Sequence, residues 1–125
     1  PHGLCISIAM QPVIRFNGVS GKVKRSPYPR YEVYRAQKDY ADIARALGLK
    51  GNSDAELVEA LCARIAQLFK DLDVEPKLSA NGVTKEQFEG ALDEMVDLIY
   101  NDQCTPANPR QPFLEEIREL LWEQF

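Results

Sequence analysis

The sequence predicts an all-α fold of about five helices. In most of the chain, apolar residues recur every three to four positions, as they do on the buried face of a helix. No segment shows the strict alternation of apolar and polar residues that is typical of a half-buried strand. Turn residues, and polar residues suited to helix starts, separate the apolar segments. With 125 residues, 45% of them hydrophobic, the chain can bury one modest core, so it is one domain or part of one.

Composition and charge exclude several classes of function. The net charge of -4 and the pI near 5.0 provide no basic surface for nucleic acid, so no nucleic-acid partner is expected. No stretch approaches the roughly 20 apolar residues of a membrane-spanning helix, so no membrane partner is expected either. Cys5, Cys62 and Cys104 are odd in number and widely spaced, which favours free thiols in a reducing compartment. We therefore expect a soluble, cytoplasmic protein.

The first predicted helix is the apolar run from Leu4 to Ile14, whose length favours a buried helix over a strand. Asn17 and Gly18 end it, and Gly18 is predicted to close the helix in the left-handed conformation. A long basic, proline-rich loop follows at about residues 19–35. Its tyrosines are expected to anchor it to a helix surface; they are Tyr28, Tyr31 and Tyr34.

The second and third helices are predicted on either side of residues 48–53. Gly48 ends the second helix, and Ser53 with Glu56 is predicted to form a capping box at the start of the third. The apolar face of the second helix consists of Ala36, Tyr40, Ile43, Ala44 and Leu47. That of the third consists of Leu57, Leu61, Ile65, Leu68 and Leu72.

A fourth helix is predicted to begin at a second capping box, formed by Thr84 and Gln87, after a turn at Asn81 and Gly82. The buried side of this helix consists of Phe88, Leu92, Met95, Val96 and Ile99. The opposite face is acidic, and we interpret it as solvated surface rather than a metal site because no histidine accompanies it. Its residues are Glu89, Asp93, Glu94 and Asp97.

The last helix is predicted to begin near Pro112, after a structured loop at residues 101–111 that contains two prolines and two asparagines. The apolar stripe of this helix consists of Leu114, Ile117, Leu120 and Leu121. Trp122 and Phe125 add an aromatic surface that is expected to pack on another segment.

Three short stretches, in this order, resemble the iron-containing alcohol dehydrogenase family. They are PHGL at residues 1–4, VIRFN at 13–17 and DQCTPANPR at 102–110. The last differs from the family's DQCTGANPR only at Pro106, while Ile6-Ser7 and Pro12 are further departures from the usual pattern. Residues 30–54, RYEVYRAQKDYADIARALGLKGNSD, are similar to a connection in the bifunctional aldehyde-alcohol dehydrogenases. The resemblance spans nearly the whole chain and favours a bifunctional parent.

This resemblance implies a fold and a site. Residues 1–125 would be a helical C-terminal domain, a fragment of the dehydroquinate synthase-like fold, facing an upstream nucleotide-binding domain across a cleft. The family holds one divalent iron with one Asp and three His, and His2 corresponds to the last of these ligands; the other three lie upstream. Zn2+ also accepts such ligands, so the donor atoms alone do not choose the metal. Cys104, Thr105 and Asn108 lie on the matching loop and are expected to line the cleft.

The reaction implied by the resemblance is the NAD-dependent interconversion of a short-chain aldehyde, acetaldehyde, and its alcohol, ethanol. The metal would polarise the alcohol, and hydride would pass to the nicotinamide of NAD. Because one ligand is no complete site, the 125-residue chain alone is expected to be inactive, and its start at Pro1 rather than Met suggests a missing upstream part. The parent is expected to be a homo-oligomer.

Two alternatives remain open at this point. The chain can be a stand-alone helical interaction module derived from the family, which binds a partner through Trp122, Phe125 and the tyrosine-bearing loop. The parent can also be a related metal-dependent polyol dehydrogenase.

Overall fold

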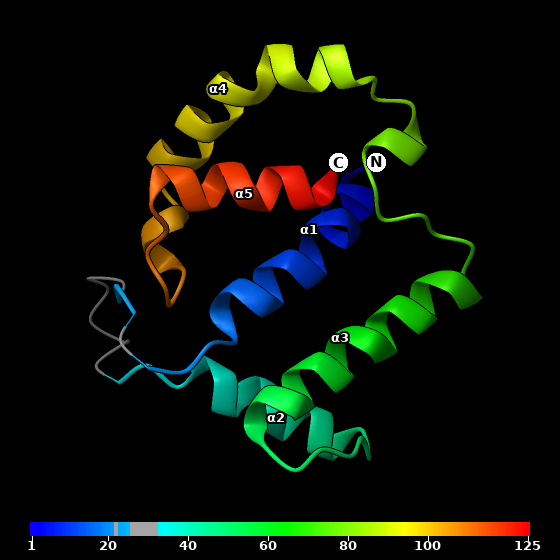
Figure 1. Cartoon of the computed structure of the whole chain (residues 1–125), viewed down its shortest axis with the longest axis vertical. Coiled ribbons are helices and arrows are strands. Elements are labelled where there is room, and N and C mark those ends of the chain that lie inside the picture. Colours follow the sequence, from blue (N-terminus) through cyan, green and yellow to red (C-terminus); the bar gives the residue numbers. More distant parts are fainter. Residues whose placement is uncertain (22, 26–32) are drawn as a thin grey trace.

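The computed structural model describes residues 1–21, 23–25 and 33–125, and in this part the fold is all-α, as predicted (Figure 1). Its α-helices are α1 (His2–Asn17), α2 (Ala36–Ala46), α3 (Asp54–Asp71), α4 (Lys85–Asn101) and α5 (Leu114–Gln124). Two short 3-10 helices, η1 (Ser79–Asn81) and η2 (Thr105–Ala107), lie before and after α4. The only β-type pairing in the described ranges is an isolated bridge between Arg25 and Arg110. None of the helices in these ranges combines the length and apolar content needed to cross a membrane.

Helix α1 is the central element of the fold. It packs on α2 and α3 with one side and on α5 with another, and Figure 1 shows it running between α3 and α5. The remaining helices form two contacting pairs, α2 with α3 and α4 with α5. Three clusters of buried side chains hold these contacts together, one within each pair and one between α1 and α3. The core is therefore divided, and α1 joins its two parts.

The predicted helix boundaries at Gly48 and Thr84 are confirmed. Gly48 has a φ of 75°, and the Leu49 N–H donates to the Ala44 carbonyl, which closes α2 in the left-handed manner. At the start of α4, the Thr84 hydroxyl accepts from the Gln87 N–H, and the Gln87 side chain accepts from the Thr84 N–H.

The capping box predicted for α3 is only half formed. The Ser53 hydroxyl accepts a hydrogen bond from the Glu56 N–H at 3.2 Å, as predicted. The Glu56 carboxylate, however, accepts from the backbone N–H of Asn52 at 2.7 Å rather than from that of Ser53. The Asn52 side chain donates to the same carboxylate oxygen at 3.1 Å, and this second donor explains the preference.

The predicted left-handed conformation of Gly18 is wrong, because its φ is -82°. Glycine is needed there for another reason: a Cβ atom would lie 2.7 Å from Cγ1 of Val58 and 2.8 Å from the carbonyl oxygen of Ile14. The missing side chain thus allows the end of α1 to approach α3 closely.

The apolar stripes are buried in their middle and exposed at their ends, so the predicted faces are partly wrong. In α2, Ile43 and Leu47 are exposed, whereas Ala41 and Ala44 are fully buried against α3. One neighbouring helix covers only a narrow arc, and small side chains suit the closest contact. The other predicted core residues that are exposed are Ile6, Val13, Leu68, Leu72, Ile99 and Leu114, while Phe69, Val58 and Cys62 are buried instead.

Aromatic side chains make two of the predicted anchoring contacts. Tyr28 and Tyr31 lie outside the described residues, but the hydroxyl of Tyr34 donates to the Asn17 carbonyl at 2.5 Å, which confirms the tyrosine anchor at that position. Trp122 and Phe125 pack on Phe88 with ring centroids 4.7 and 4.8 Å apart, so they contact another helix as predicted.

Candidate functional site

His2, the predicted metal ligand, lies in the exposed first turn of α1. At 3.6 residues per turn, His2, Ile6, Ala9 and Val13 share one face of the helix. None of the described residues makes a hydrogen bond or an ion pair with the imidazole ring, and no group of three or more His, Cys, Asp or Glu in these ranges could hold a metal ion. An unengaged imidazole on an exposed helix end fits one ligand of a metal site whose other ligands come from elsewhere.

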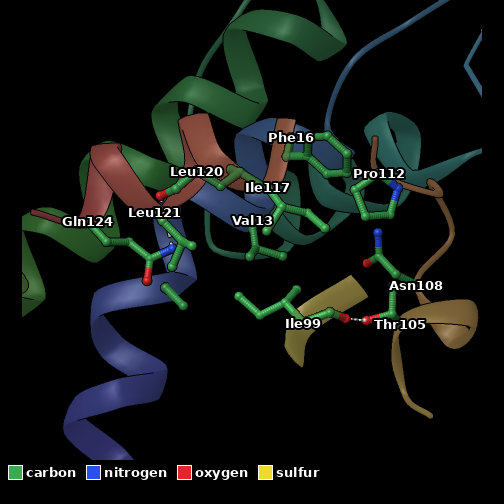
Figure 2. Close-up of a pocket in the computed structure, with 11 residues that line it drawn as sticks. Val13, Phe16, Ile99, Thr105, Asn108, Pro112, Ile117, Leu120, Leu121 and Gln124 are labelled. Carbon is green, nitrogen blue, oxygen red and sulfur yellow. Dashed lines mark hydrogen bonds between the residues drawn. The ribbon is translucent and has the colours of Figure 1, made fainter. Parts of the chain in front are cut away.

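An apolar pocket of about 240 Å³ opens between the second half of α1, η2 and α5 (Figure 2). Thr105 and Asn108, both predicted to line a cleft, belong to its wall, whereas Cys104 does not. The other lining residues are Ala9, Val13, Phe16, Ile99, Pro112, Ile117, Leu120, Leu121 and Gln124.

The polar side chains in this wall are engaged within the protein. The Thr105 hydroxyl donates to the Ile99 carbonyl, drawn as a dashed line in Figure 2, and the Gln124 amide donates to the Leu120 carbonyl at 3.0 Å. The Asn108 amide donates to the Asn17 side chain and to the Arg110 carbonyl. The pocket therefore presents mainly hydrocarbon to whatever lies against it.

Cys104 lies at the exposed start of the same loop. The Asp102 carboxylate accepts a hydrogen bond from the Cys104 N–H at 2.7 Å, which holds the turn before η2. A side-chain hydrogen bond with Asp102, together with the negative charge of that carboxylate, raises the pKa of the Cys104 thiol. Such a thiol stays protonated at neutral pH and is unsuited to act as a nucleophile.

Asn17 and Asn108 form a reciprocal amide pair, which the sequence did not reveal. The Nδ2 atom of each side chain donates to the Oδ1 atom of the other, and both distances are 2.9 Å. Asn17 is 2% exposed and is the only buried polar residue in the described part of the chain. Asn108 uses its second N–H to donate to the Arg110 carbonyl at 2.5 Å. The pair joins the end of α1 to the end of η2.

Arg110 strengthens the same junction. Its guanidinium lies 3.8 Å from the centroid of the Phe16 ring and donates from Nη1 to the Phe16 carbonyl at 2.6 Å. Its Nη2 atom forms an ion pair with Glu116 of α5, and both side chains are largely buried. Loop, α1 and α5 are thereby fixed to one another.

The structure brings Thr105 and Asn108 to the second half of α1 and leaves His2 at the opposite end. Seven residues separate His2 from Ala9 at the edge of the pocket, which corresponds to about 10 Å along the helix axis. The face of α1 that carries His2 thus continues into the pocket wall through Ile6, Ala9 and Val13.

Comparison with known proteins identifies the family to which the chain belongs. The family model described as "Fe-containing alcohol dehydrogenase family, C-terminal" matches residues 1–125. The chain belongs to the Fe-containing alcohol dehydrogenase family. The all-helical fold is the C-terminal domain of that family.

Relatives in the Fe-containing alcohol dehydrogenase family include long and short proteins. The chain is 38% identical to the aldehyde-alcohol dehydrogenase of Clostridium acetobutylicum, over 96% of this chain and 14% of that protein. It is 32% identical to the bifunctional aldehyde-alcohol dehydrogenase AdhE of Escherichia coli, over 100% of this chain and 14% of that protein. An alcohol dehydrogenase of Thermococcus barophilus is 38% identical over 100% of this chain and 28% of its own length. The chain thus spans about one seventh of the length of the aldehyde-alcohol dehydrogenases.

Proposed function

We propose that residues 1–125 are the helical C-terminal domain of an NAD-dependent, iron-dependent alcohol dehydrogenase that interconverts acetaldehyde and ethanol. The observation that carries this proposal is the match of the whole chain to the Fe-containing alcohol dehydrogenase family, with His2 exposed at the start of the helix that also forms the pocket wall. The similarity to aldehyde-alcohol dehydrogenases over 96% to 100% of the chain supports a bifunctional parent.

His2 would contribute one imidazole ligand to the Fe2+ of the parent, and Zn2+ would also be accepted by such a ligand. When bound, the metal supplies a Lewis acid that polarises the substrate oxygen. The ring of His2 is accessible and has no competing partner in the described part of the chain, which supports this role.

The other proposed cleft residues would have structural rather than ligand roles. Thr105 contributes to an apolar wall, because its O–H donates to the Ile99 carbonyl and is not available as a donor to a substrate or cofactor. Asn108 holds the wall in place through its amide. Cys104 would line the cleft as a neutral thiol, since its pKa is raised by Asp102. None of these groups exchanges a proton readily at neutral pH, which keeps this wall chemically inert.

The exposed apolar side chains of Ile6 and Val13 support the proposed partner, an upstream nucleotide-binding domain that covers this face of α1 and supplies NAD. The substrate would be a small alcohol or aldehyde, and the parent would assemble as a homo-oligomer. Three free cysteines support a cytoplasmic location.

The alternative of a stand-alone interaction module receives less support. It relied on Trp122 and Phe125 as a binding surface, but both rings pack on the buried Phe88. Phe125 packs against the core between α4 and α5, and the Trp122 ring, although 39% exposed, also rests on Phe88.

The proposal is tested by replacing His2 with Ala in the full-length enzyme. We expect the H2A variant to lose bound iron and alcohol-dependent reduction of NAD, because one ligand is removed from the metal. The matched control is Cys5→Ala, which deletes another exposed, potentially ligating side chain in the next turn and should change neither quantity. Iron content is measured by elemental analysis, and turnover by NADH absorbance.

Unchanged iron content and turnover in H2A would contradict the assignment of His2. The 125-residue chain by itself is expected to reduce no NAD in the presence of alcohol and iron. Measurable turnover by this chain alone would show that the remaining ligands are not needed from outside it.

A further inference from the structure

We propose that Asn17 and Asn108 are positioning residues that fix the gap between α1, which carries His2, and the loop that carries Cys104 and Thr105. The inference rests on the proposed function, since it assigns these amides to the wall of the same cleft.

The hydrogen bonds engage both the N–H donor and the oxygen acceptor of each amide. Asn108 donates with both of its N–H groups, to Asn17 and to the Arg110 carbonyl, and accepts from Asn17 with its oxygen. Asn17 is buried, and its backbone carbonyl accepts from the Tyr34 hydroxyl. Because each side chain must both donate to and accept from the other, a neutral amide at each position fulfils the geometry, whereas a carboxylate lacks the donor and an aliphatic side chain lacks both functions.

The amide pair lies at one of the two attachments that hold the loop forming the pocket wall. Toward its start, the loop is tied to α4 through the hydrogen bond from Thr105 to the Ile99 carbonyl. Toward its end, it is tied to α1 through Asn108. The pocket lies between these two attachments, with Val13 and Phe16 of α1 opposite Ile99 and Thr105 (Figure 2). Breaking the amide pair would loosen this side of the pocket and leave Arg110 as the side chain that still ties the loop to α1.

The orientation of α1 also depends on its second half. The buried residues of the helix are Ile8, Pro12, Ile14 and Asn17, whereas His2 and the rest of the first turn are largely exposed. The direction in which His2 points is consequently set by contacts farther along the helix. Among the side chains of α1, Asn17 makes hydrogen bonds to the loop through its amide, and the Phe16 carbonyl accepts a further one from Arg110.

The first test uses Asn108→Asp in the 125-residue chain, with hydrogen exchange of backbone amides measured by NMR. At neutral pH the carboxylate cannot donate to Asn17, so the η2 amides of Ala107 and residue 108, which donate to the Cys104 and Thr105 carbonyls, should exchange roughly tenfold faster or more relative to α3. At acidic pH the protonated carboxyl can again donate to and accept from Asn17, but it has no second donor for the Arg110 carbonyl, so protection corrected for intrinsic rates should return in part. Asn108→Ala should loosen the loop at every pH.

The control is Thr84→Ala, which removes a helix cap of comparable size at the start of α4. It should leave the ratio of loop exchange to α3 exchange unchanged. If N108D and N108A also leave this ratio unchanged, the amide pair does not hold the loop and the proposal is overturned.

The second test places N108D and T84A in the full-length enzyme. N108D should retain iron while kcat/KM for the alcohol falls roughly tenfold to hundredfold, because the cleft wall is displaced. T84A should keep the iron content and the kcat/KM of the wild type. Wild-type kcat/KM in an iron-loaded N108D enzyme would overturn the positioning role. A wild-type enzyme without alcohol-dependent NAD reduction would instead refute the proposed function, and the exchange experiment would not be affected by that failure.

Discussion

Replacing Gly18 with Ala should destabilise the fold, although the same change is favourable at many other glycines. At a negative φ, Gly→Ala normally stabilises a protein by roughly 0.4 to 1 kcal/mol, because the unfolded chain loses conformational freedom. The φ of Gly18 is -82°, so this gain is available. The new Cβ, however, would lie 2.7 Å from Cγ1 of Val58 and 2.8 Å from the Ile14 carbonyl oxygen. Overpacking of this kind costs roughly 1 to 3 kcal/mol, so we expect a net loss of about 1 to 2 kcal/mol.

The measurement is urea unfolding of the 125-residue chain, followed by far-UV circular dichroism. The matched control is Gly90→Ala in α4, where an added Cβ meets nothing within 4 Å. G90A should stabilise the chain by roughly 0.5 to 1 kcal/mol, because alanine is the better helix former. The two Gly→Ala substitutions should therefore change the free energy of unfolding in opposite directions.

A double-mutant cycle with Val58→Ala tests the assigned contact. V58A removes both γ carbons that face Gly18, at 2.7 and 3.4 Å from the added Cβ, so G18A should cost at least about 0.5 kcal/mol less in the V58A background. If G18A stabilises the chain as much as G90A does, or if its cost is unaffected by V58A, the close approach of α1 and α3 at this point is not what requires glycine.

Two further predictions concern aromatic residues. Phe88→Ala should lower the free energy of unfolding by roughly 3 to 5 kcal/mol and shift the Trp122 fluorescence to the red, because Phe88 is 1% exposed and contacts both Trp122 and Phe125; unchanged urea unfolding would contradict its central place in the core. Tyr34→Phe should remove an alkaline loss of stability: burial raises the pKa of Tyr34 above the ordinary tyrosine value of 10.0, so the stabilisation by the neutral hydroxyl is present below that pH and is lost as pH rises through the folded-state pKa. The urea midpoint of unfolding should therefore fall more steeply with rising alkaline pH in the wild type than in Y34F. Equal slopes in the two proteins would show that ionisation of the Tyr34 hydroxyl does not cause the loss of stability.

Local sequence signals predicted the helices well because local interactions determine where helices begin and end. The Thr84 capping box and the closing turn at Gly48 involve only neighbouring residues, and both are present in the structure. The burial of apolar stripes is less local. Ile43 and Leu47 continue a regular stripe, yet no neighbouring helix covers them, and a stripe does not specify the width of the surface it meets.

The candidate site was predictable only in part. The amide pair joins residues 91 positions apart, so no periodicity or spacing rule relates Asn17 to Asn108. The one available signal was that both asparagines fall in stretches that resemble the family. The proposed role of His2 came from the resemblance alone, because a single histidine carries no spacing information about a metal site.

The central place of α1 has a consequence for the order of folding. Helix α1 precedes the other helices in these residues, but its contacts with α5 join distant parts of the sequence; Arg110 reaches the Phe16 carbonyl across 94 positions. Long-range closures of this kind carry a high entropic cost and are slow compared with the pairing of α2 with α3 or of α4 with α5. We therefore infer that the two helix pairs form early and that docking of α5 on α1 completes folding. The wall of the pocket would then be absent from partly folded chains.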